Sequence, residues 1–458
     1  MIYGCFLQYN TGVLNFTLVI LGKIISYISQ LVNLGYGSTW PGHVALNVNK
    51  NFIKEIVKAN PQLKIILIAG TNGKTTTCKL IQTILETANY RVFQNESGAN
   101  LLNGIASSML LRSSILSTIN YDYAIFEVDE ATLPLILKEI FPHYLILLNL
   151  FRDQLDRYGE VNTIASKWRE AIKNLSPKTQ LILNADDPQV ALLGLHRGGV
   201  SVPPLRWKHD NIFFFGLNDK TLHQVSHQHA VDSTYCPNCN SKLRYHSIYY
   251  SHLGDWECTN CQYKRPKNIF ATPPSSKLTG TYNLYNILAA TLLAKKIGIS
   301  EDVINNSLNT FLPAFGRQEI LKVDSKKVQI FLSKNPTSFN ESLRTIASLG
   351  AKNVLFVLND RIPDGRDVSW IWDVDFEDYV DELKNITVSG DRCYDMRLRI
   401  KYAERSEIRN SKFEIKADLK EAIKYSLDNT SKSEMLYVLP TYSAMLRVRK
   451  ILTGKKIL

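Results

Sequence analysis

The chain has 458 residues, of which 45% are hydrophobic and 21% charged, and its net charge at pH 7 is +12, with a sequence pI of about 9.1. This length predicts two or three domains with large cores, and because low-complexity tracts and internal repeats are absent, the composition excludes a disordered or repeat protein. The positive charge suits an acidic partner, namely nucleic acid, an anionic membrane face or a phosphorylated substrate.

The N-terminal segment, residues 1–60, is expected to be helical. Between residues 13 and 34, polar residues interrupt a run of Leu, Ile and Val, and the apolar side chains follow a helical stripe that consists of Leu14, Leu18, Leu21, Ile25, Ile28 and Val32. No basic residue precedes Lys23 and no small-residue cleavage site follows, so a secretory signal is not expected. We expect an amphipathic docking or membrane-surface helix, with a spanning anchor or a plain core helix as the alternatives.

A glycine-containing turn follows the buried strand that is expected at residues 65–68. The pattern G-x-x-G-K-T is shorter between its glycines than the common phosphate-binding loop, and the apolar spacing becomes helical directly afterwards. Gly70 and Gly73 let the backbone close around phosphates, and Lys74 can reach the β- and γ-phosphates. The Thr75 hydroxyl can hold Mg²⁺. We predict a nucleotide site rather than a plain strand–helix turn, formed by Gly70, Thr71, Asn72, Gly73, Lys74, Thr75 and Thr76.

The segment GTNGKTTT at residues 70–77 resembles the ATP-binding loop of the Mur ligases and folylpolyglutamate synthetases. These enzymes join an amino group to a carboxylate through an acyl phosphate. Glu127 ends an apolar strand at the place where the superfamily keeps a Mg²⁺-binding Glu, although a lone Glu there could also be a solvated strand end. The resemblance implies catalytic roles for Lys74 and Glu127. The segment 149–160 resembles the one that carries a D-H-L-D motif in the ligases, with Gln154 in place of the His.

Two later segments extend the same resemblance. Residues 183–188 and 280–290 are similar to later nucleotide-site motifs of the superfamily. The resemblance implies that Asn283 and Asn286 lie near the adenine and that Arg317 lies near the phosphates. Taken alone, Asp186 and Asp187 would also fit a turn before Pro188, and Asn286 would fit an ordinary helix start. Their order along the chain is what favours the nucleotide-site interpretation.

Four cysteines form two C-x-x-C pairs that are separated by eighteen residues, within an insertion at about residues 232–268. This is zinc-ribbon spacing, in which four thiolates complete a closed tetrahedral site. Two disulfides are the alternative, and His223, His227 and His229 lie just upstream as competing ligands. We predict a structural Zn²⁺ site formed by Cys236, Cys239, Cys258 and Cys261.

The C-terminal part, residues 313–458, again alternates strands and helices and predicts a second parallel α/β domain after the central domain at residues 61–312. Its most distinctive segment is the acidic, Trp-containing loop at residues 359–377, which begins where a strand ends. By composition alone this loop could equally be a solvated acidic loop whose tryptophans pack inward.

The short N-terminus, the four-Cys insertion and the motif LNDxxxDGRDxSWIWD together resemble the MurT family, from about residue 40 to the end. This family comprises the Mur-ligase-like subunits of lipid II isoglutaminyl synthases. The resemblance implies an α/β fold with a Mur-ligase-type P-loop ATPase domain, an inserted Cys₄ zinc ribbon and a C-terminal Rossmann-like domain. It also implies ATP, Mg²⁺ and Zn²⁺ as cofactors and a GatD-like glutaminase as the partner in a heterodimer. Asp367 is then the residue that completes the catalytic triad of the partner.

The implied reaction is ATP-dependent amidation of the D-glutamate α-carboxylate in the lipid II stem peptide, with ammonia from the glutaminase. We expect a cytoplasmic protein, with peripheral contact to the inner face of the membrane as a further expectation. One alternative is a stand-alone Mur or folylpolyglutamate-type amide ligase. Another is a zinc-ribbon nucleic-acid-binding ATPase, but the chain has no aromatic–basic recognition motif, so nucleic acid is not expected as a partner. The intact Gly-Lys-Thr turn disfavours a non-catalytic scaffold.

Overall fold

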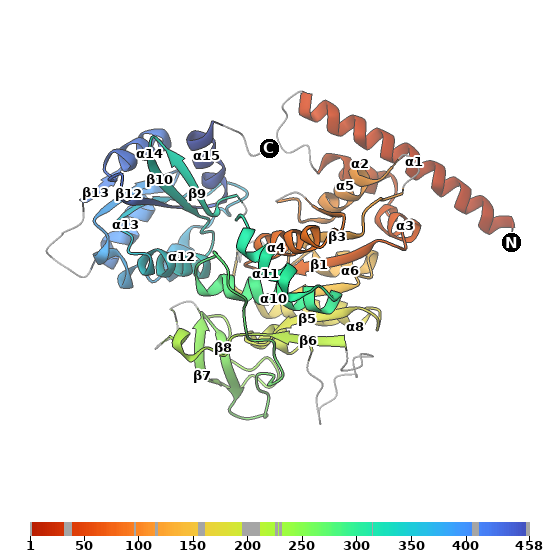
Figure 1. The fold of residues 1–458 in the computed structure, drawn as a ribbon, viewed down its shortest axis with the longest axis horizontal. Helices are drawn as coiled ribbons and strands as arrows, with labels where there is room; N and C mark the ends of the chain where they lie inside the picture. Colours follow the sequence, from red (N-terminus) through yellow and green to blue (C-terminus); the bar gives the residue numbers. More distant parts are fainter. Residues whose placement is uncertain are drawn as a thin grey trace.

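The described part of this computed structural model has two six-stranded sheets and one two-stranded hairpin, together with the helices that pack on them. Figure 1 shows their arrangement. The structure describes residues 2–31, 39–95, 98–114, 118–153, 161–194, 211–224, 228, 231–313, 315–404 and 412–454, and within the first helix it describes the side chains of residues 14–29. Of the residues named above, Val32, Gln154, His227 and His229 lie outside this part.

The first sheet is parallel throughout and has the strand order β2-β3-β1-β4-β5-β6. Its strands are β1 (Lys64–Ala69), β2 (Val92–Gln94), β3 (Tyr123–Val128), β4 (Tyr144–Leu147), β5 (Gln180–Asn184) and β6 (Ile212–Phe215). Because β1 lies between β3 and β4, the loop after Ala69 leaves the carboxyl edge in the middle of the sheet. Ligands of parallel sheets bind at this edge.

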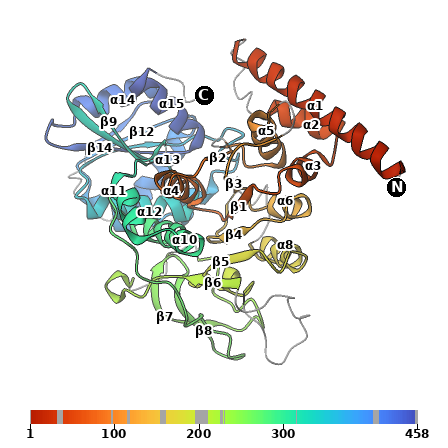
Figure 2. The same cartoon turned by 45° about the vertical axis from the view of Figure 1, so that its right-hand side comes forward.

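Helices cover both faces of the first sheet (Figure 2). One face carries α5 (Leu102–Arg112), α6 (Leu133–Glu139) and α8 (Val161–Lys173). The other face carries α4 (Lys74–Thr87), α10 (Thr281–Ile297) and α11 (Glu301–Thr310). Ile65 and Leu67 of β1 belong to the first core, whereas Ile66 and Ile68 belong to the second. This alternation explains the continuous apolar run of β1, since a parallel strand covered on both faces buries every side chain.

The insertion forms an antiparallel hairpin of β7 (Leu243–Tyr250) and β8 (Leu253–Cys258). Trp256 Nε1 donates a hydrogen bond to the Ala185 carbonyl over 3.2 Å, and Arg265 pairs with the buried Asp186 over 2.6 Å. Tyr263 Oη donates to the carbonyl of Pro188, the first residue of the short helix α9 (Pro188–Ala191), over 2.7 Å. The segment 183–188, which resembles a nucleotide-site motif, therefore holds the hairpin against the first sheet.

The second sheet has the order β13-β12-β11-β14-β10-β9, parallel except for the edge strand β9. Its strands are β9 (Arg317–Val323), β10 (Lys326–Phe331), β11 (Asn353–Val357), β12 (Asn385–Ser389), β13 (Lys412–Ile415) and β14 (Met435–Pro440). Its helices are α12 (Pro336–Ser348) and α13 (Cys393–Ala403) on one face, and α14 (Leu419–Asp428) and α15 (Tyr442–Thr453) on the other. Helix α12 begins with a capping box of Asn335 and Ser338. This capping box fixes the conformation of the chain between β10 and α12.

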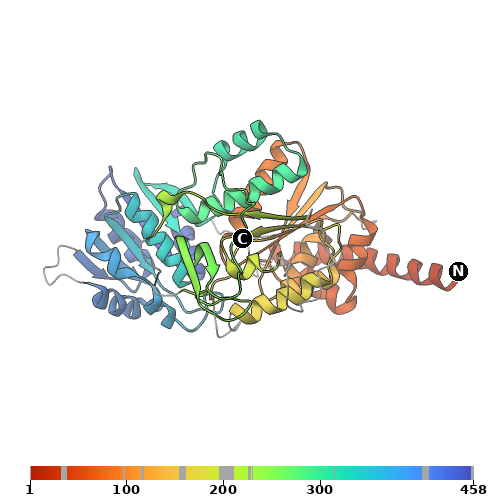
Figure 3. The same ribbon diagram turned by 90° about the horizontal axis from the view of Figure 1, so that it is seen from below.

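Three helices precede the first sheet, namely α1 (Ile2–Leu31), α2 (Trp40–Val48) and α3 (Phe52–Ala59). Helix α1 projects at the end of the molecule opposite the second sheet (Figure 3). Within the described residues, no helix is both long and apolar enough to cross a membrane.

The predicted helical stripe of α1 is only partly the face that packs on the protein. Leu18 is 3% exposed, but Leu21 and Ile28 of the same stripe are 45% and 50% exposed. Gly22 lies on the face that packs on the protein, and it allows α1 to approach α5 so closely that an added Cβ would lie 2.4 Å from a Leu110 methyl carbon. A helix lies where the sequence predicts one, and its docking or membrane-surface role stays a prediction.

Candidate active site

The phosphate loop connects β1 to α4 and has two glycines with positive φ, 147° at Gly70 and 89° at Gly73. A Cβ on Gly73 would lie 2.1 Å from Asn286 Oδ1, so only glycine fits there. The Asn72 backbone N–H donates to Asn149 Oδ1 over 2.9 Å, which ties the loop to the segment after β4. The loop conformation is thus fixed by protein contacts alone.

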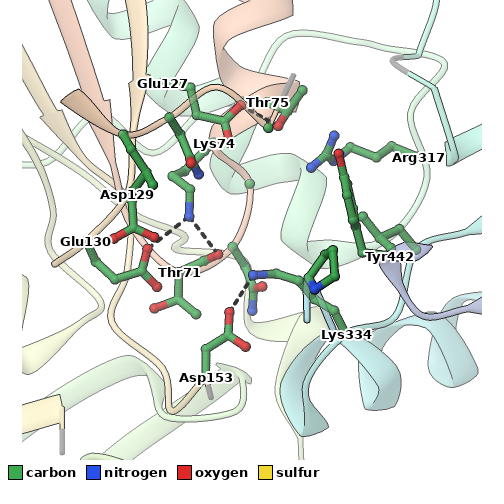
Figure 4. Close-up of a pocket in the computed structure, with 17 residues that line it drawn as sticks. Thr71, Lys74, Thr75, Glu127, Asp129, Glu130, Asp153, Arg317, Lys334 and Tyr442 are labelled. Carbon is green, nitrogen blue, oxygen red and sulfur yellow. Dashed lines mark hydrogen bonds and ion pairs between the residues drawn. The ribbon is translucent and has the colours of Figure 1, made fainter. Parts of the chain in front are cut away.

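Lys74 lies at the start of α4 and is 7% exposed. Its Nζ donates to the carbonyl oxygens of Gly70 and Thr71 over 2.5 Å and 3.2 Å, and it forms an ion pair with Glu130 Oε2 at 3.1 Å (Figure 4). Trp168 Nε1 donates to the backbone carbonyl of Glu130 over 2.7 Å, so helix α8 fixes the backbone from which this carboxylate extends. Lys74, which the sequence predicts to bind phosphates, is therefore paired with the carboxylate of Glu130 in this structure.

Carboxylates around Lys74 keep it charged. Burial by itself lowers the pKa of Lys74, but the negative charges of Glu130, Glu127 and Asp129 outweigh it and raise the pKa above its ordinary value. Burial likewise raises the pKa of Glu130, and the charges of Lys74 and Lys334 outweigh it and lower the pKa below its ordinary value. Both groups of the pair are therefore ionised at neutral pH.

Thr75 and Glu127 provide two oxygen ligands beside the phosphate loop. Thr75 Oγ1 donates to Glu127 Oε2 over 2.5 Å, and Glu127 is 8% exposed. Asn95 fixes the backbone of Glu127 through two hydrogen bonds, from its Nδ2 to the Glu127 carbonyl and from the Glu127 N–H to its Oδ1. Mg²⁺ prefers hard oxygen ligands, and in nucleotide sites phosphate oxygens supply some of them. The hydroxyl of Thr75 and the carboxylate of Glu127 therefore fit the Mg²⁺ ion that the sequence predicts.

The second domain closes the other side of the phosphate pocket. Lys334, which follows β10, forms an ion pair with Asp153 Oδ2, and Arg317 and Tyr442 line the same pocket (Figure 4). Burial raises the pKa of Asp153 even though Lys334 lowers it. The other carboxylate oxygen of Asp153, Oδ1, has no hydrogen-bond partner among the described residues.

A second pocket adjoins the first at Asn72, Gly73 and Arg317. Asn286 Nδ2 donates to Asn283 Oδ1 over 3.1 Å at the start of α10, so the two predicted adenine residues lie together. The remaining lining comes from the hairpin, the first domain and the second domain, and consists of Thr76, Tyr250, Tyr282, Gln318, Phe331, Ser338 and Glu341. The arrangement offers a flat aromatic and amide-lined space next to a phosphate site, as a purine nucleotide requires.

Asp367 lies apart from both pockets, on the exposed loop of the second domain. Its Oδ1 accepts a hydrogen bond from the Ser369 N–H over 2.8 Å, and this contact lowers the pKa of Asp367. Pro363, on the same loop, lines the phosphate pocket. Asp364 is buried and accepts a hydrogen bond from the N–H of Ser443, the neighbour of Tyr442, over 2.7 Å. One loop thus reaches from the phosphate pocket to the outer surface.

The four predicted cysteines lie together at the base of the hairpin, with their sulfur atoms all within 4.8 Å of one another. Cys236 Sγ lies 3.6 Å from Cys261 Sγ, and Cys239 Sγ lies 3.4 Å from Cys258 Sγ. These separations exceed the roughly 2.05 Å of a disulfide bond, and all four thiols are free. His223 Nδ1 accepts a hydrogen bond from the Ile248 N–H instead of facing the sulfurs.

Sequence reasoning missed four charged residues of the phosphate pocket, namely Asp129, Glu130, Asp153 and Lys334. Glu130 follows Glu127 by three residues in the sequence, and Asp153 lies within the segment 149–160. Lys334 follows the carboxyl end of a strand, which is where ligand-binding residues of parallel sheets gather. That strand-end position is the signal that could have identified Lys334.

The Mur ligase middle domain family matches residues 68–199. The solved structure of a pseudomurein peptide ligase type C from Methanothermus fervidus is similar to this chain, with a TM-score of 0.63 and 21% identity over 88% of this chain and 81% of that one. A folylpolyglutamate synthase from Thermotoga maritima has a TM-score of 0.52 and 16% identity over 88% of this chain and 93% of its own. The fold and the phosphate site therefore define a protein with the Mur ligase fold.

The MurT ligase C-terminal family matches residues 332–445. The subunit MurT of the glutamine-hydrolyzing lipid II isoglutaminyl synthase of Staphylococcus aureus (strain COL) is 34% identical over 406 residues, 85% of this chain and 88% of that protein. The subunit MurT of the same synthase from Streptococcus pneumoniae (strain ATCC BAA-255 / R6) is 32% identical over 462 residues, 95% and 97% of the two chains. The chain belongs to the MurT family, as the resemblance in its motifs predicted.

Proposed function

We propose that this chain is the ATP-dependent synthetase subunit of a lipid II isoglutaminyl synthase, which amidates the D-glutamate α-carboxylate of the lipid II stem peptide to D-isoglutamine. Family membership supports the substrate, since the relatives are named as subunits of that enzyme. The observation that carries the reaction type is the pocket between the two domains, where the phosphate loop faces Arg317 and Lys334. Together these favour the proposal over a stand-alone amide ligase and over a nucleic-acid-binding ATPase.

The residues of the pocket have complementary roles in this reaction. Lys74 binds the β- and γ-phosphates of ATP, and Arg317 and Lys334 neutralise charge on the γ-phosphoryl group as it moves to the carboxylate. Thr75 and Glu127 would hold Mg²⁺, which would supply further neutralisation of the phosphate charge. Ammonia then attacks the acyl phosphate, so that a carbon–nitrogen bond forms and phosphate leaves. Pairing of both domains around the pocket excludes water, which would otherwise hydrolyse the acyl phosphate.

The test is amidation of lipid II by the full chain with ATP and ammonium, followed by mass spectrometry of the stem peptide. We expect amide product from the wild type and a rate lower by about 10²-fold or more in Lys74→Ala, since one cation is lost at the transferring group. Lys79→Ala, on the same helix, is the matched control and should keep the wild-type rate, because the Lys79 side chain donates a hydrogen bond to Gln82 and not to a residue of the pocket. Absence of ATP-dependent amide from the wild type, or equal rates for Lys74→Ala and the control, would contradict the proposal.

The partner surface is proposed on the second domain, around Asp367. Large apolar side chains are exposed there on α13 and the adjoining loop, with Trp372 49%, Tyr394 70%, Leu398 47% and Tyr402 69% exposed. The rings of Trp372 and Tyr402 lie 5.8 Å apart, so they form one patch. Aromatic residues at the centre of an exposed patch are typical of protein interfaces. In the proposal a GatD-like glutaminase binds here, and Asp367 orients its catalytic His.

The four cysteines are proposed to hold one structural Zn²⁺. Four converging thiols with no open coordination position fit a closed tetrahedral site, which stabilises a small hairpin without taking part in catalysis. The domain division proposed with it is an N-terminal helical segment at residues 1–60, a central ATP-binding domain at 61–312 with the ribbon at about 232–268, and a C-terminal Rossmann-like domain at 313–458. The strand order of the second sheet supports the last of these.

A further inference from the structure

Helix α1 turns an apolar face to the solvent. Six large apolar side chains of its described part are more than a third exposed, namely Leu14, Phe16, Leu21, Ile24, Tyr27 and Ile28. A helix on a protein surface normally presents charged and polar residues to water. Residues 14–29 contain no Asp or Glu and a single Lys, Lys23. We call these six side chains the outer face of α1.

The opposite face of α1 is already occupied by the protein. Val19 is fully buried, and the buried Asn15 donates from Nδ2 to Glu55 Oε2 of α3 over 2.8 Å. Gly22 packs against Leu110 of α5 without room for a Cβ. This side of α1 is fixed to the first domain, so a further binding partner can reach only the outer face. The surface of that partner must accommodate a helix that lies along it.

The dimensions and residue types of the outer face fit a lipid surface. From Leu14 to Ile28 the helix rises by about 21 Å, which gives a long, narrow apolar strip. Tyr27 lies near one end of the strip, and Trp40, at the start of α2, is 58% exposed. Tyr and Trp, whose rings carry a polar group, are favoured at the boundary between lipid headgroups and acyl chains.

Charge favours an anionic bilayer over a second copy of this chain. Lys54 and Lys58 are exposed on α3, which lies beside α1 in Figures 1 and 2, and the whole chain carries a net charge of +12. Positive charge of this kind attracts a protein to an anionic leaflet. Two copies joined through this face would bring equal positive charges together. The six side chains also expose only on the order of 600 Å², less than the roughly 800 Å² per partner that stable dimers bury.

We propose that the outer face of α1 docks on the surface of an anionic membrane, with the helix lying along it. The proposal extends the proposed function, because a lipid-linked substrate would then be held in the same layer as the enzyme. Docking itself depends only on α1 and its neighbours, so it can be measured without substrate, nucleotide or partner. Failure of docking would leave the amidation test unaffected, and failure of amidation would leave docking unaffected.

The experiment is flotation of the full chain with vesicles of phosphatidylglycerol and phosphatidylcholine, compared with phosphatidylcholine alone. The test variant is Leu21→Glu with Ile24→Glu, whose original side chains are 45% and 48% exposed. The matched control is Leu349→Glu with Ile451→Glu in the second domain, whose original side chains are 42% and 37% exposed. Thermal melting of each variant shows that it is folded.

We expect the wild type and the control to float with the anionic vesicles, and the test variant to bind at least about 10-fold more weakly. Binding of the wild type should weaken as salt is raised, because the lysine contribution is screened. The proposal is overturned if the wild type does not float, or if test and control variants bind equally. It is also overturned if the wild type forms a dimer in analytical ultracentrifugation without lipid and the test variant does not, since the face would then join two copies.

Discussion

Replacing Lys334 by Ala removes the cation that the second domain places against the buried Asp153. The side chains of Lys334 and Asp153 are 27% and 4% exposed, so the pair is largely desolvated. Breaking a buried ion pair costs about 3–5 kcal/mol, and the partial exposure of Lys334 reduces this to roughly 2–3 kcal/mol in free energy of unfolding. Loss of a cation beside the transferring phosphoryl group should also lower the amidation rate by about 10²-fold.

A second substitution separates the two effects. In Lys334→Ala with Asp153→Asn, no unpaired carboxylate remains, so the free energy of unfolding should return to within about 1 kcal/mol of the wild type while the rate stays low. Lys352→Ala, an exposed lysine of the same domain, is the control for loss of a charge. Denaturant unfolding and ammonium-dependent amidation are the measurements. A rate of Lys334→Ala within threefold of the control, or full recovery of the rate in the double variant, would refute the assignment.

Three further outcomes are expected. Cys258→Ser should lower the zinc content of the purified chain and its melting temperature, as measured by atomic absorption and calorimetry, and zinc-free wild type would contradict this. Asp367→Asn should reduce glutamine hydrolysis by the complex by orders of magnitude and leave ammonium-dependent amidation intact; unchanged glutaminase activity would assign the residue to packing. Burial raises the pKa of Glu341 from 4.5 to about 7, so its stabilising effect is full below about pH 4.5 and is lost as the pH rises to about 7. Over that window the free energy of unfolding of the wild type should fall by ~3 kcal/mol relative to Glu341→Gln, and parallel pH–stability curves would argue against it.

Local pattern was sufficient to predict the phosphate loop. Strand, glycines and helix start are contiguous in sequence, and the geometry that they require, including the positive φ of Gly70 and Gly73, is set within a few residues. The four cysteines were predictable for a similar reason, since each C-x-x-C pair defines its own turn. The joint placement of Asn283 and Asn286 needed the family resemblance, because nothing between residue 76 and residue 283 specifies that the two segments meet.

The position of Lys334 after a strand end marks it as a candidate, but its pairing with Asp153 depends on packing that no local pattern encodes. Lys334 reaches Asp153 only because the second sheet docks against the first domain, and sequence patterns do not specify that contact. The side of α1 that packs on the protein has a similar cause. An apolar stripe identifies a helix, but Gly22 and Asn15 select the buried side through close approach and a hydrogen bond, and neither residue contributes hydrophobicity. Where apolar residues surround a helix, periodicity alone does not determine which side is buried.

In the phosphate site, the carboxylate of Glu130 and a bound phosphate would compete for the same cation, Lys74. A phosphate that contacts Lys74 must displace a carboxylate that is already bonded at 3.1 Å, so the exchange of one anion for another yields little net energy. Inorganic phosphate, with few other contacts, gains almost nothing from it. In the proposed function, a triphosphate would also engage the loop amides, Arg317 and Lys334, and these additional contacts would favour its binding. Glu130 would then disfavour inorganic phosphate, which lacks those contacts, and so favour release of the phosphate product.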